Sequence, residues 1–119
     1  MESLYVRILE NGREVQLIKP FVVYFKKRKP ITVPNGFVTD FASIPQPFWS
    51  IVSPWGKYAP ATVLHDYLYF NGFMSREESD KIFLTVMKRL KVSRWKRNIM
   101  YTAVRVFGNI VWKKYRQRS

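Results

Sequence analysis

Alternating apolar and other side chains at the start of the chain predict β-structure. Leu4, Val6 and Ile8 follow this spacing of two, and apolar residues return after Asn11-Gly12. Asn-Gly is typical of a type I′ turn, because both residues accept positive φ angles. We therefore expect a β-hairpin with strands at 4–10 and 13–18.

Short apolar segments continue as far as residue 39. They are separated by the basic run Lys26–Lys29 with Pro30, and by Pro34-Asn35-Gly36, which are turn signals. Further strands are predicted at 21–25, 31–33 and 37–39. Residues 1–39 are therefore expected to form one small antiparallel β-sheet.

Residues 40–59 form an apolar connector that prolines interrupt repeatedly. One helical turn is expected at 47–52. The connector is too apolar for a flexible linker, so we expect it to pack over the functional site.

Helical spacing of apolar residues begins near residue 60 and predicts three helices. The first runs from Pro60, accepted in a first helical turn, to about Phe70 before Asn71-Gly72. The second starts at the capping box Ser75–Glu78 and runs to about Leu90. The third spans about 93–115.

The predicted fold class is α+β, with a small N-terminal antiparallel β-sheet followed by three α-helices. The short connection between the first two helices makes them an antiparallel pair. A chain of 119 residues is expected to be one domain, with a β-sheet part at 1–39, the connector at 40–59 and a helical part at 60–119.

Composition limits the function classes. The sequence has no cysteine, which excludes disulfides, thiol chemistry and thiolate metal sites. No secretory signal and no transmembrane segment are expected. The net charge of +13 implies an anionic partner, which is phospholipid, nucleic acid or an acidic virion protein.

The charge is concentrated near the end of the sequence. Residues 81–119 carry twelve Lys or Arg and no acidic residue, and aromatic residues are interleaved with them. A solvated basic face is the alternative to an anion-binding surface. The residues predicted to bind the anion are Arg94, Arg97, Arg105, Lys113, Lys114 and Arg116.

The third helix is apolar nearly all round, with a narrow polar stripe. A protein of this size cannot easily bury so much apolar surface. An oligomer or a place in a larger assembly is therefore expected.

The only histidine, His65, is the centre of the candidate site. His65 and Asp80 are equally distant in sequence from the turn at Gly72-Phe73, so an antiparallel helix pair places them at the same height. Tyr69 follows His65 by four residues and shares its helix face. We expect a His65–Asp80 hydrogen bond, direct or through one water, with the other ring nitrogen free to act as a base.

Two further aspartates lie near this site in the sequence. Asp66 points about 100° away from His65 around the helix, toward the connector or Asp40, where the two could bind a cation. The alternative is structural, with His65 and Asp80 satisfying each other in the core and Asp66 capping connector backbone.

Two resemblances involve these residues. The segments at 33–45 (VPNGFVTDFASIP), 65–69 (HDYLY) and 79–83 (SDKIF) resemble a family of small bacteriophage and prophage proteins classed as a domain of unknown function. The resemblance covers about residues 30–110. It implies a phage origin and names no activity.

The second resemblance is local. His65-Asp66-x-x-Tyr69 followed by Asp80 is similar to the site of phospholipase A2 enzymes. It implies catalytic roles for His65 as the base, Asp80 as its orienting partner and Tyr69 as a supporting hydroxyl, with Asp66 as a Ca²⁺ ligand. The glycine-rich calcium loop and the disulfides of that family are absent here, and Asp40 is the candidate substitute ligand.

Three functions are therefore considered. The first is a phage-encoded protein that hydrolyses or binds anionic phospholipid. The second is a virion-associated structural protein of the tail, neck or capsid interior. The third is a nucleic-acid-binding accessory protein. The expected location is the bacterial host cytoplasm or the virion.

Overall fold

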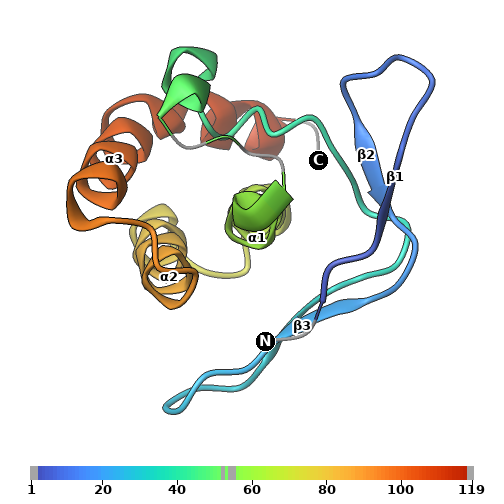
Figure 1. Ribbon diagram of the computed structural model, residues 1–119, viewed down its shortest axis with the longest axis horizontal. Coiled ribbons are helices and arrows are strands. Elements are labelled where there is room, and N and C mark those ends of the chain that lie inside the picture. The colour runs from blue at the N-terminus through green and yellow to red at the C-terminus, as the bar shows by residue number, and fades with distance from the viewer. Residues whose placement is uncertain (1–2, 52, 54–55, 118–119) are drawn as a thin grey trace. The chain divides into compact units, whose positions relative to one another are not determined.

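The computed structural model describes residues 3–51, 53 and 56–117. The chain divides into two compact units, Met1–Asp40 and Phe41–Ser119. The first unit contains the strands and the second the helices, so the predicted α+β class is confirmed (Figure 1). The prediction that all 119 residues make one domain stays a prediction.

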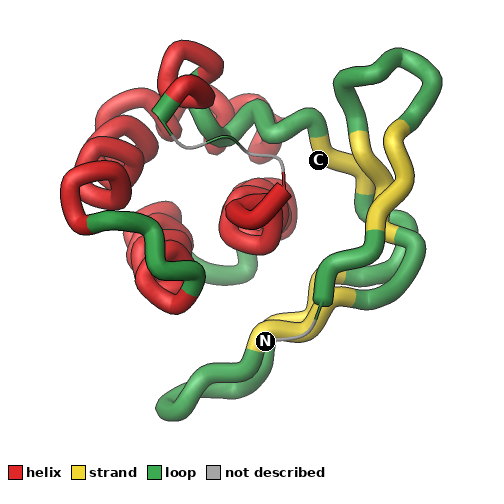
Figure 2. Tube along the Cα trace, in the orientation of Figure 1, coloured by secondary structure: helices red, strands yellow, loops and turns green. Residues whose placement is uncertain are grey.

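In the described part of the first unit, residues 3–40, five short strands form two antiparallel sheets (Figure 2). β2 (Val15–Leu17) lies between β1 (Val6–Ile8) and β5 (Val38–Thr39) in one sheet. β3 (Phe21–Val23) pairs with β4 (Ile31–Val33) in the other. The sequence predicts one sheet here and the structure contains two.

The break between the two sheets has a local cause. The chain bends at residues 18–19 and continues into Pro20, which has no N–H group for a strand ladder. On both sides of the break the strands keep the period of two. In β2 and β3 buried residues alternate with partly exposed ones, as the sequence pattern predicts.

The first hairpin differs from the type I′ prediction. The last hydrogen bond of the ladder runs from Leu9 N to Glu14 O at 2.9 Å, which leaves a four-residue loop. Gly12 takes a positive φ of 70° but Asn11 does not. Instead the Asn11 side-chain oxygen accepts from the N–H groups of Arg13 and Glu14, at 2.9 and 3.0 Å. The two-residue turn is wrong because the asparagine caps loop backbone rather than entering the left-handed region.

Three helices build the second unit: α1 (Ala59–Asn71), α2 (Arg76–Arg89) and α3 (Arg94–Gln117). Their bounds lie within two residues of the predicted ones. The helix-end signals in the sequence are also confirmed. Gly72 ends α1 with a φ of 70°, and the Ser75 hydroxyl accepts from Glu78 N at 3.1 Å at the start of α2.

Side-chain contacts establish that α1 and α2 are antiparallel. His65 contacts Asp80, and Tyr69 contacts Arg76. Moving four residues forward along α1 therefore moves four residues backward along α2. α1 packs against both α2 and α3, and most of its residues are buried.

In the described residues of the connector lie the short 3-10 helices η1 (Gln46–Ser50) and η2 (Gly56–Tyr58). The first corresponds to the predicted turn at 47–52, although Val52 lies outside the described residues. The indole of Trp49 donates to Ile44 O at 3.1 Å. The ring of Trp49 also meets that of Phe41 edge-on, with the centroids 6.4 Å apart. These contacts hold residues 41–49 in a compact loop.

α3 has more apolar side-chain surface than the rest of the second unit covers. Its buried residues are Met100, Ala103, Val104 and Gly108. Several large apolar side chains of the same helix are exposed, namely Trp95, Val106, Phe107 and Ile110. This agrees with the surplus of apolar surface that the sequence indicates, and the expected oligomer stays a prediction.

Replacement of Gly12 by valine is expected to lower the free energy of unfolding by about 1 kcal/mol or more. The cause is the positive φ, which a β-branched residue resists. A Cβ atom at Gly12 would meet nothing within 4 Å, so crowding does not contribute. Gly12→Asn is the matched control, because asparagine tolerates this region. Chemical denaturation showing equal stability for the two variants would contradict the assigned conformation.

Candidate functional site

The carboxylate of Asp80 is the centre of the site. His65 Nε2 lies 2.7 Å from Asp80 Oδ1, and the Tyr69 hydroxyl donates to the same oxygen at 2.7 Å. All three side chains are fully buried, with Asp80 and His65 each 0 % exposed. The direct His65–Asp80 contact expected from the equal heights of the two residues is confirmed, as is the nearby Tyr69.

Two arginines neutralise the other oxygen of Asp80. Arg105 Nη1 lies 2.7 Å from Oδ2, and Arg76 Nη1 lies 3.5 Å from it. Arg76 also donates to the backbone oxygens of Val104 and Arg105, at 2.9 and 3.2 Å. The carboxylate thus joins α2 to both α1 and α3. The guanidinium of Arg105, expected in an anion-binding surface, is engaged with a carboxylate of its own chain.

These contacts shift two pKa values in opposite directions. Burial alone would raise the pKa of the Asp80 carboxyl. The hydrogen bond and charge of His65, with hydrogen bonds from Tyr69 and Arg105, outweigh it and hold that pKa below its usual range. Burial, together with the adjacent carboxylate, raises the pKa of Tyr69 far above its usual value. Asp80 is therefore ionised and accepts hydrogen bonds, whereas Tyr69 keeps its proton and donates one.

The second ring nitrogen of His65 contacts Ser43. His65 Nδ1 and Ser43 Oγ are 3.0 Å apart. Since an ionised Asp80 only accepts, Nε2 carries a hydrogen, and in the neutral form of the ring Nδ1 is the acceptor. In that form the Ser43 hydroxyl donates to Nδ1. The rings of Tyr69 and Phe83 hold the imidazole, with centroids 4.3 and 4.6 Å from its own. Ser43, His65 and Asp80 form a hydrogen-bonded chain of hydroxyl, imidazole and carboxylate.

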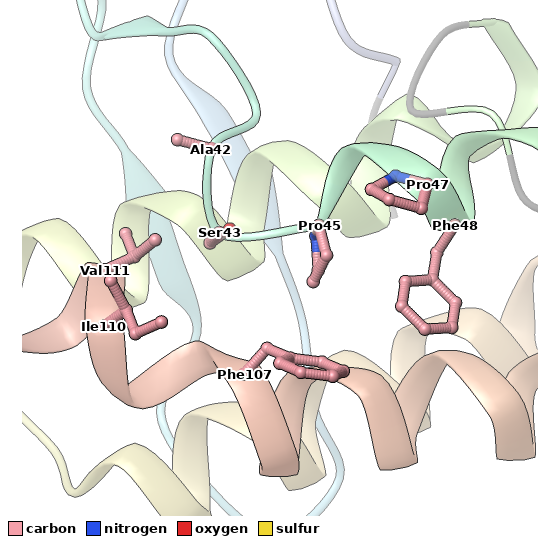
Figure 3. A pocket seen from close by; sticks show the side chains of 8 residues that line it. All are labelled: Ala42, Ser43, Pro45, Pro47, Phe48, Phe107, Ile110 and Val111. Carbon is pink, nitrogen blue, oxygen red and sulfur yellow. The ribbon is translucent and has the colours of Figure 1, made fainter.

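Ser43 also lines an apolar pocket of about 340 Å³. Figure 3 shows the pocket between the connector and α3. Of the eight residues around it, Ser43 is the one with a polar side chain. The others are Ala42, Pro45, Pro47, Phe48, Phe107, Ile110 and Val111. Ser43 is only 1 % exposed, so this lining residue lies beside an apolar hollow and away from bulk water.

Ser43 and Arg76 are the site residues that sequence reasoning missed. Ser43 belongs to an irregular loop, where no periodicity predicts the direction of a side chain. It does stand in the segment 33–45 that carries the family resemblance. Arg76 lies four residues before Asp80 on α2, a spacing that could have indicated an ion pair. The prediction that the connector covers the site is confirmed by the Ser43–His65 contact.

Asp66 faces α3. It is fully buried, and its carboxylate accepts from the Tyr115 hydroxyl, at 3.3 Å to Oδ1 and 3.2 Å to Oδ2. Asp40 is exposed at the end of the first unit. Within the described ranges, no three His, Cys, Asp or Glu side chains gather as a metal site. The calcium site with Asp66 and Asp40 stays a prediction.

The six predicted anion-binding residues fall into two groups. In the first group the side chain is engaged within the chain. Arg105 binds Asp80, Arg97 donates to Val92 O, and Arg116 donates to Tyr69 O and Phe70 O. Through these two bonds Arg116 caps the carboxyl end of α1, and its guanidinium also lies over the Trp112 ring. The second group consists of exposed residues, namely Arg94, Lys113 and Lys114. The anion-binding role of all six stays a prediction.

Gly108 gives Tyr69 room to reach Asp80. It is buried in α3, and a Cβ atom there would overlap the Tyr69 hydroxyl. The ring of Trp112, one turn further along α3, meets the Tyr69 ring edge-on with the centroids 5.2 Å apart. The glycine is therefore required by the close approach of the tyrosine, and the helix accepts its lower propensity at this position.

Fold and site together define a small α+β protein with a buried carboxylate that joins three helices. The family described as "Protein of unknown function (DUF1353)" matches residues 15–104, and the chain belongs to this family. This confirms the expected domain of unknown function. The phage origin and the phospholipase A2 resemblance stay predictions.

The chain is 40 % identical over 78 residues to the "Uncharacterized protein y4jT" of Sinorhizobium fredii. The match covers 64 % of this chain and 23 % of that protein, so the chain spans less than a quarter of the relative's length. No solved structure matches the chain. In the part of the chain that the structure describes, no helix has both the length and the apolar run needed to cross a bilayer.

Gly108→Ala is expected to destabilise the protein by about 1–3 kcal/mol, because the added methyl group displaces the Tyr69 hydroxyl from Asp80. Tyr69→Phe removes the clashing atom. The double variant should therefore lose less stability than the sum of the two single changes. Asn109→Ala, at the exposed neighbouring position, is the control. Additive losses in denaturant unfolding would contradict this packing.

Protonation of Asp80 at low pH is expected to lower the free energy of unfolding. Its pKa is lowered in the folded state, so its stabilising contribution is complete above the unfolded value of 3.8 and is lost as the pH falls further. The pH dependence of the unfolding free energy below 3.8 should be shallower in Asp80→Asn than in the wild type. Glu77→Gln, at an exposed carboxyl of the same helix, is the matched control. Equal slopes for Asp80→Asn and wild type would contradict the assignment.

Proposed function

We propose that this protein is an ester hydrolase whose nucleophile is the hydroxyl of Ser43. The observation that carries the proposal is the chain Ser43–His65–Asp80, with contacts of 3.0 and 2.7 Å, beside an apolar pocket. A serine hydroxyl is a weak nucleophile unless a base takes its proton. The acceptor nitrogen Nδ1 is already in hydrogen-bond contact with that hydroxyl.

The reaction follows from these positions. Ser43 Oγ attacks the ester carbonyl carbon while His65 Nδ1 takes the hydroxyl proton. The tetrahedral intermediate collapses, and the alcohol leaves with the proton from Nδ1, so Ser43 carries the acyl group. Water then attacks the acyl carbon and gives a proton to Nδ1. The acid is released, and the proton returns to Ser43 Oγ.

Asp80 and Tyr69 act as positioning residues in this scheme. The ionised carboxylate fixes the tautomer with the hydrogen on Nε2 and stabilises the imidazolium that forms when Nδ1 is protonated. Tyr69, Arg105 and Arg76 hold the carboxylate through their own contacts. The base is therefore oriented before a substrate arrives, which lowers the reorganisation needed in the transition state.

The helix residues of this site also support the likeness to phospholipase A2. In that resemblance an aspartate of an antiparallel helix holds the histidine, as Asp80 holds His65 here. A water would be activated at the other ring nitrogen, where this chain has Ser43.

The proposed substrate is an ester of an anionic lipid, taken from a membrane surface. The apolar pocket suits an acyl chain and excludes a strongly polar group. The net charge of +13 and the exposed Arg94, Lys113 and Lys114 suit an anionic lipid surface.

The full burial of His65 and Asp80 favours a second function, a structural one. A buried polar network with all its members satisfied specifies how helices pack. In that case the Ser43–His65–Asp80 chain only joins the connector to the helices, and the protein is a component of a larger assembly such as a virion.

Purified protein is expected to release fatty acid from vesicles of phosphatidylglycerol, and Ser43→Ala to lower kcat at least about 1,000-fold. Rapid mixing should show a burst of alcohol release equal to the enzyme concentration, because the acyl group stays on Ser43. Ser50→Ala is the matched control, since Ser50 is exposed in the same connector and its hydroxyl donates to Pro47 O.

The outcomes separate the candidate functions. Undiminished hydrolysis by Ser43→Gly would contradict the serine route and indicate water activation by His65. No hydrolysis of any lipid ester by folded protein would indicate the structural role.

A further inference from the structure

A second hollow adjoins the pocket at Ser43. Its volume is about 310 Å³, and it is lined by Phe48 and by residues of α3 between Asn98 and Phe107. Phe48 and Phe107 line both hollows. Their rings are tilted by 41° with centroids 6.2 Å apart, and Figure 3 shows both side chains at the first hollow. The two hollows therefore share this aromatic pair as a wall.

Three large apolar side chains of α3 that line the hollows are exposed. Val106 is 58 % exposed, Phe107 47 % and Ile110 57 %. Large apolar side chains gathered at a hollow mark a binding surface more often than isolated exposed ones do. The lining extends from Asn98 to Val111, which is about 20 Å of helix at 1.5 Å per residue.

We infer that the two hollows form one groove for the acyl chain of a lipid ester, with the ester group at Ser43. This inference rests on the proposed function, because it takes Ser43 as the reacting end. The chain runs from Ser43 across the rings of Phe48 and Phe107 into the second hollow. The occupant is a single long acyl chain and not a protein segment.

Length and polarity support this occupant. One leaflet of a bilayer is about 15 Å of hydrocarbon, so a membrane acyl chain fits within the groove. A peptide strand would leave its backbone groups without partners against these apolar walls. In the first hollow, Ser43 supplies the one polar side chain, at the end where a carbonyl would lie.

Charge supports the direction of the chain. Lys113 and Lys114 are exposed within one turn beyond Val111, which lines the first hollow. An anionic head group attached to the ester would lie at that end of α3. The second hollow, near Asn98 and Thr102, would then receive the terminal methyl end.

The test is titration of the 119-residue protein with cis-parinaric acid, a long-chain fatty acid that fluoresces in apolar surroundings. Thr102→Trp fills the second hollow from an exposed helix position and is expected to weaken binding at least about tenfold. Loss of contact with a few methylene groups accounts for that factor. Thr85→Trp, at an exposed position of α2 that lines neither hollow, is the matched control and should bind like wild type.

A second variant keeps the test decisive if Thr102→Trp fails to fold. Val106→Glu places a charge in the same hollow and should also weaken binding, with circular dichroism showing an intact fold. In hydrolysis, Thr102→Trp should shift the preference from long-chain toward short-chain esters.

Each outcome decides between the two proposals. Absence of cis-parinaric acid binding, or equal binding by Thr102→Trp and wild type, would overturn the groove even if short esters were hydrolysed. Binding that both groove variants weaken, without hydrolysis of any ester, would support the groove and overturn the hydrolase. A lipid-free dimer that Thr102→Trp dissociates in sedimentation would overturn the lipid occupant in favour of a second copy.

Discussion

The helical unit depends on keeping one carboxylate charged away from water. Burying an ion costs several kcal/mol, and good geometry with a full set of hydrogen bonds is needed to offset it. Asp80 meets this condition with His65, Tyr69 and Arg105, and Arg76 adds a longer ion pair. These partners come from all three helices. Removing any one of them leaves charge or a polar group unpaired in the core, so the packing of the unit is specified by electrostatics as well as by apolar area.

The fixed carboxylate of Asp80 also fixes the orientation of the His65 ring. A carboxylate fixed by several donors cannot turn away from Nε2, so the opposite nitrogen, Nδ1, faces the connector and Ser43. The stabilising core and the candidate catalytic base are therefore one network. A protein that keeps such a network gains a uniquely oriented imidazole, whether or not a substrate is present.

Regular periodicity made part of this predictable. The helices, their caps and the His65–Asp80 contact follow from spacing, because residues on an antiparallel pair have calculable heights. Spacing says nothing of an irregular loop, so the role of Ser43 was not predicted. A surface was expected for Arg105 because its helix carries many basic residues, yet the buried charge of Asp80 attracts its guanidinium. Asn11 could either adopt a left-handed backbone conformation or use its side chain to cap the loop, and the sequence does not decide between them. In the structure its side-chain oxygen accepts from the N–H groups of Arg13 and Glu14.

The order of the partners along the sequence bears on how the chain is made. Arg105 follows Asp80 by 25 residues, and Arg116 follows Tyr69 by 47. At roughly 5–20 residues per second, a ribosome takes about one to five seconds to add Arg105 after Asp80. During that interval α1 and α2 have a carboxylate whose strongest cationic partner does not yet exist. The carboxylate therefore gains its full set of partners only once α3 has been made, which favours assembly of the second unit after α3 has emerged.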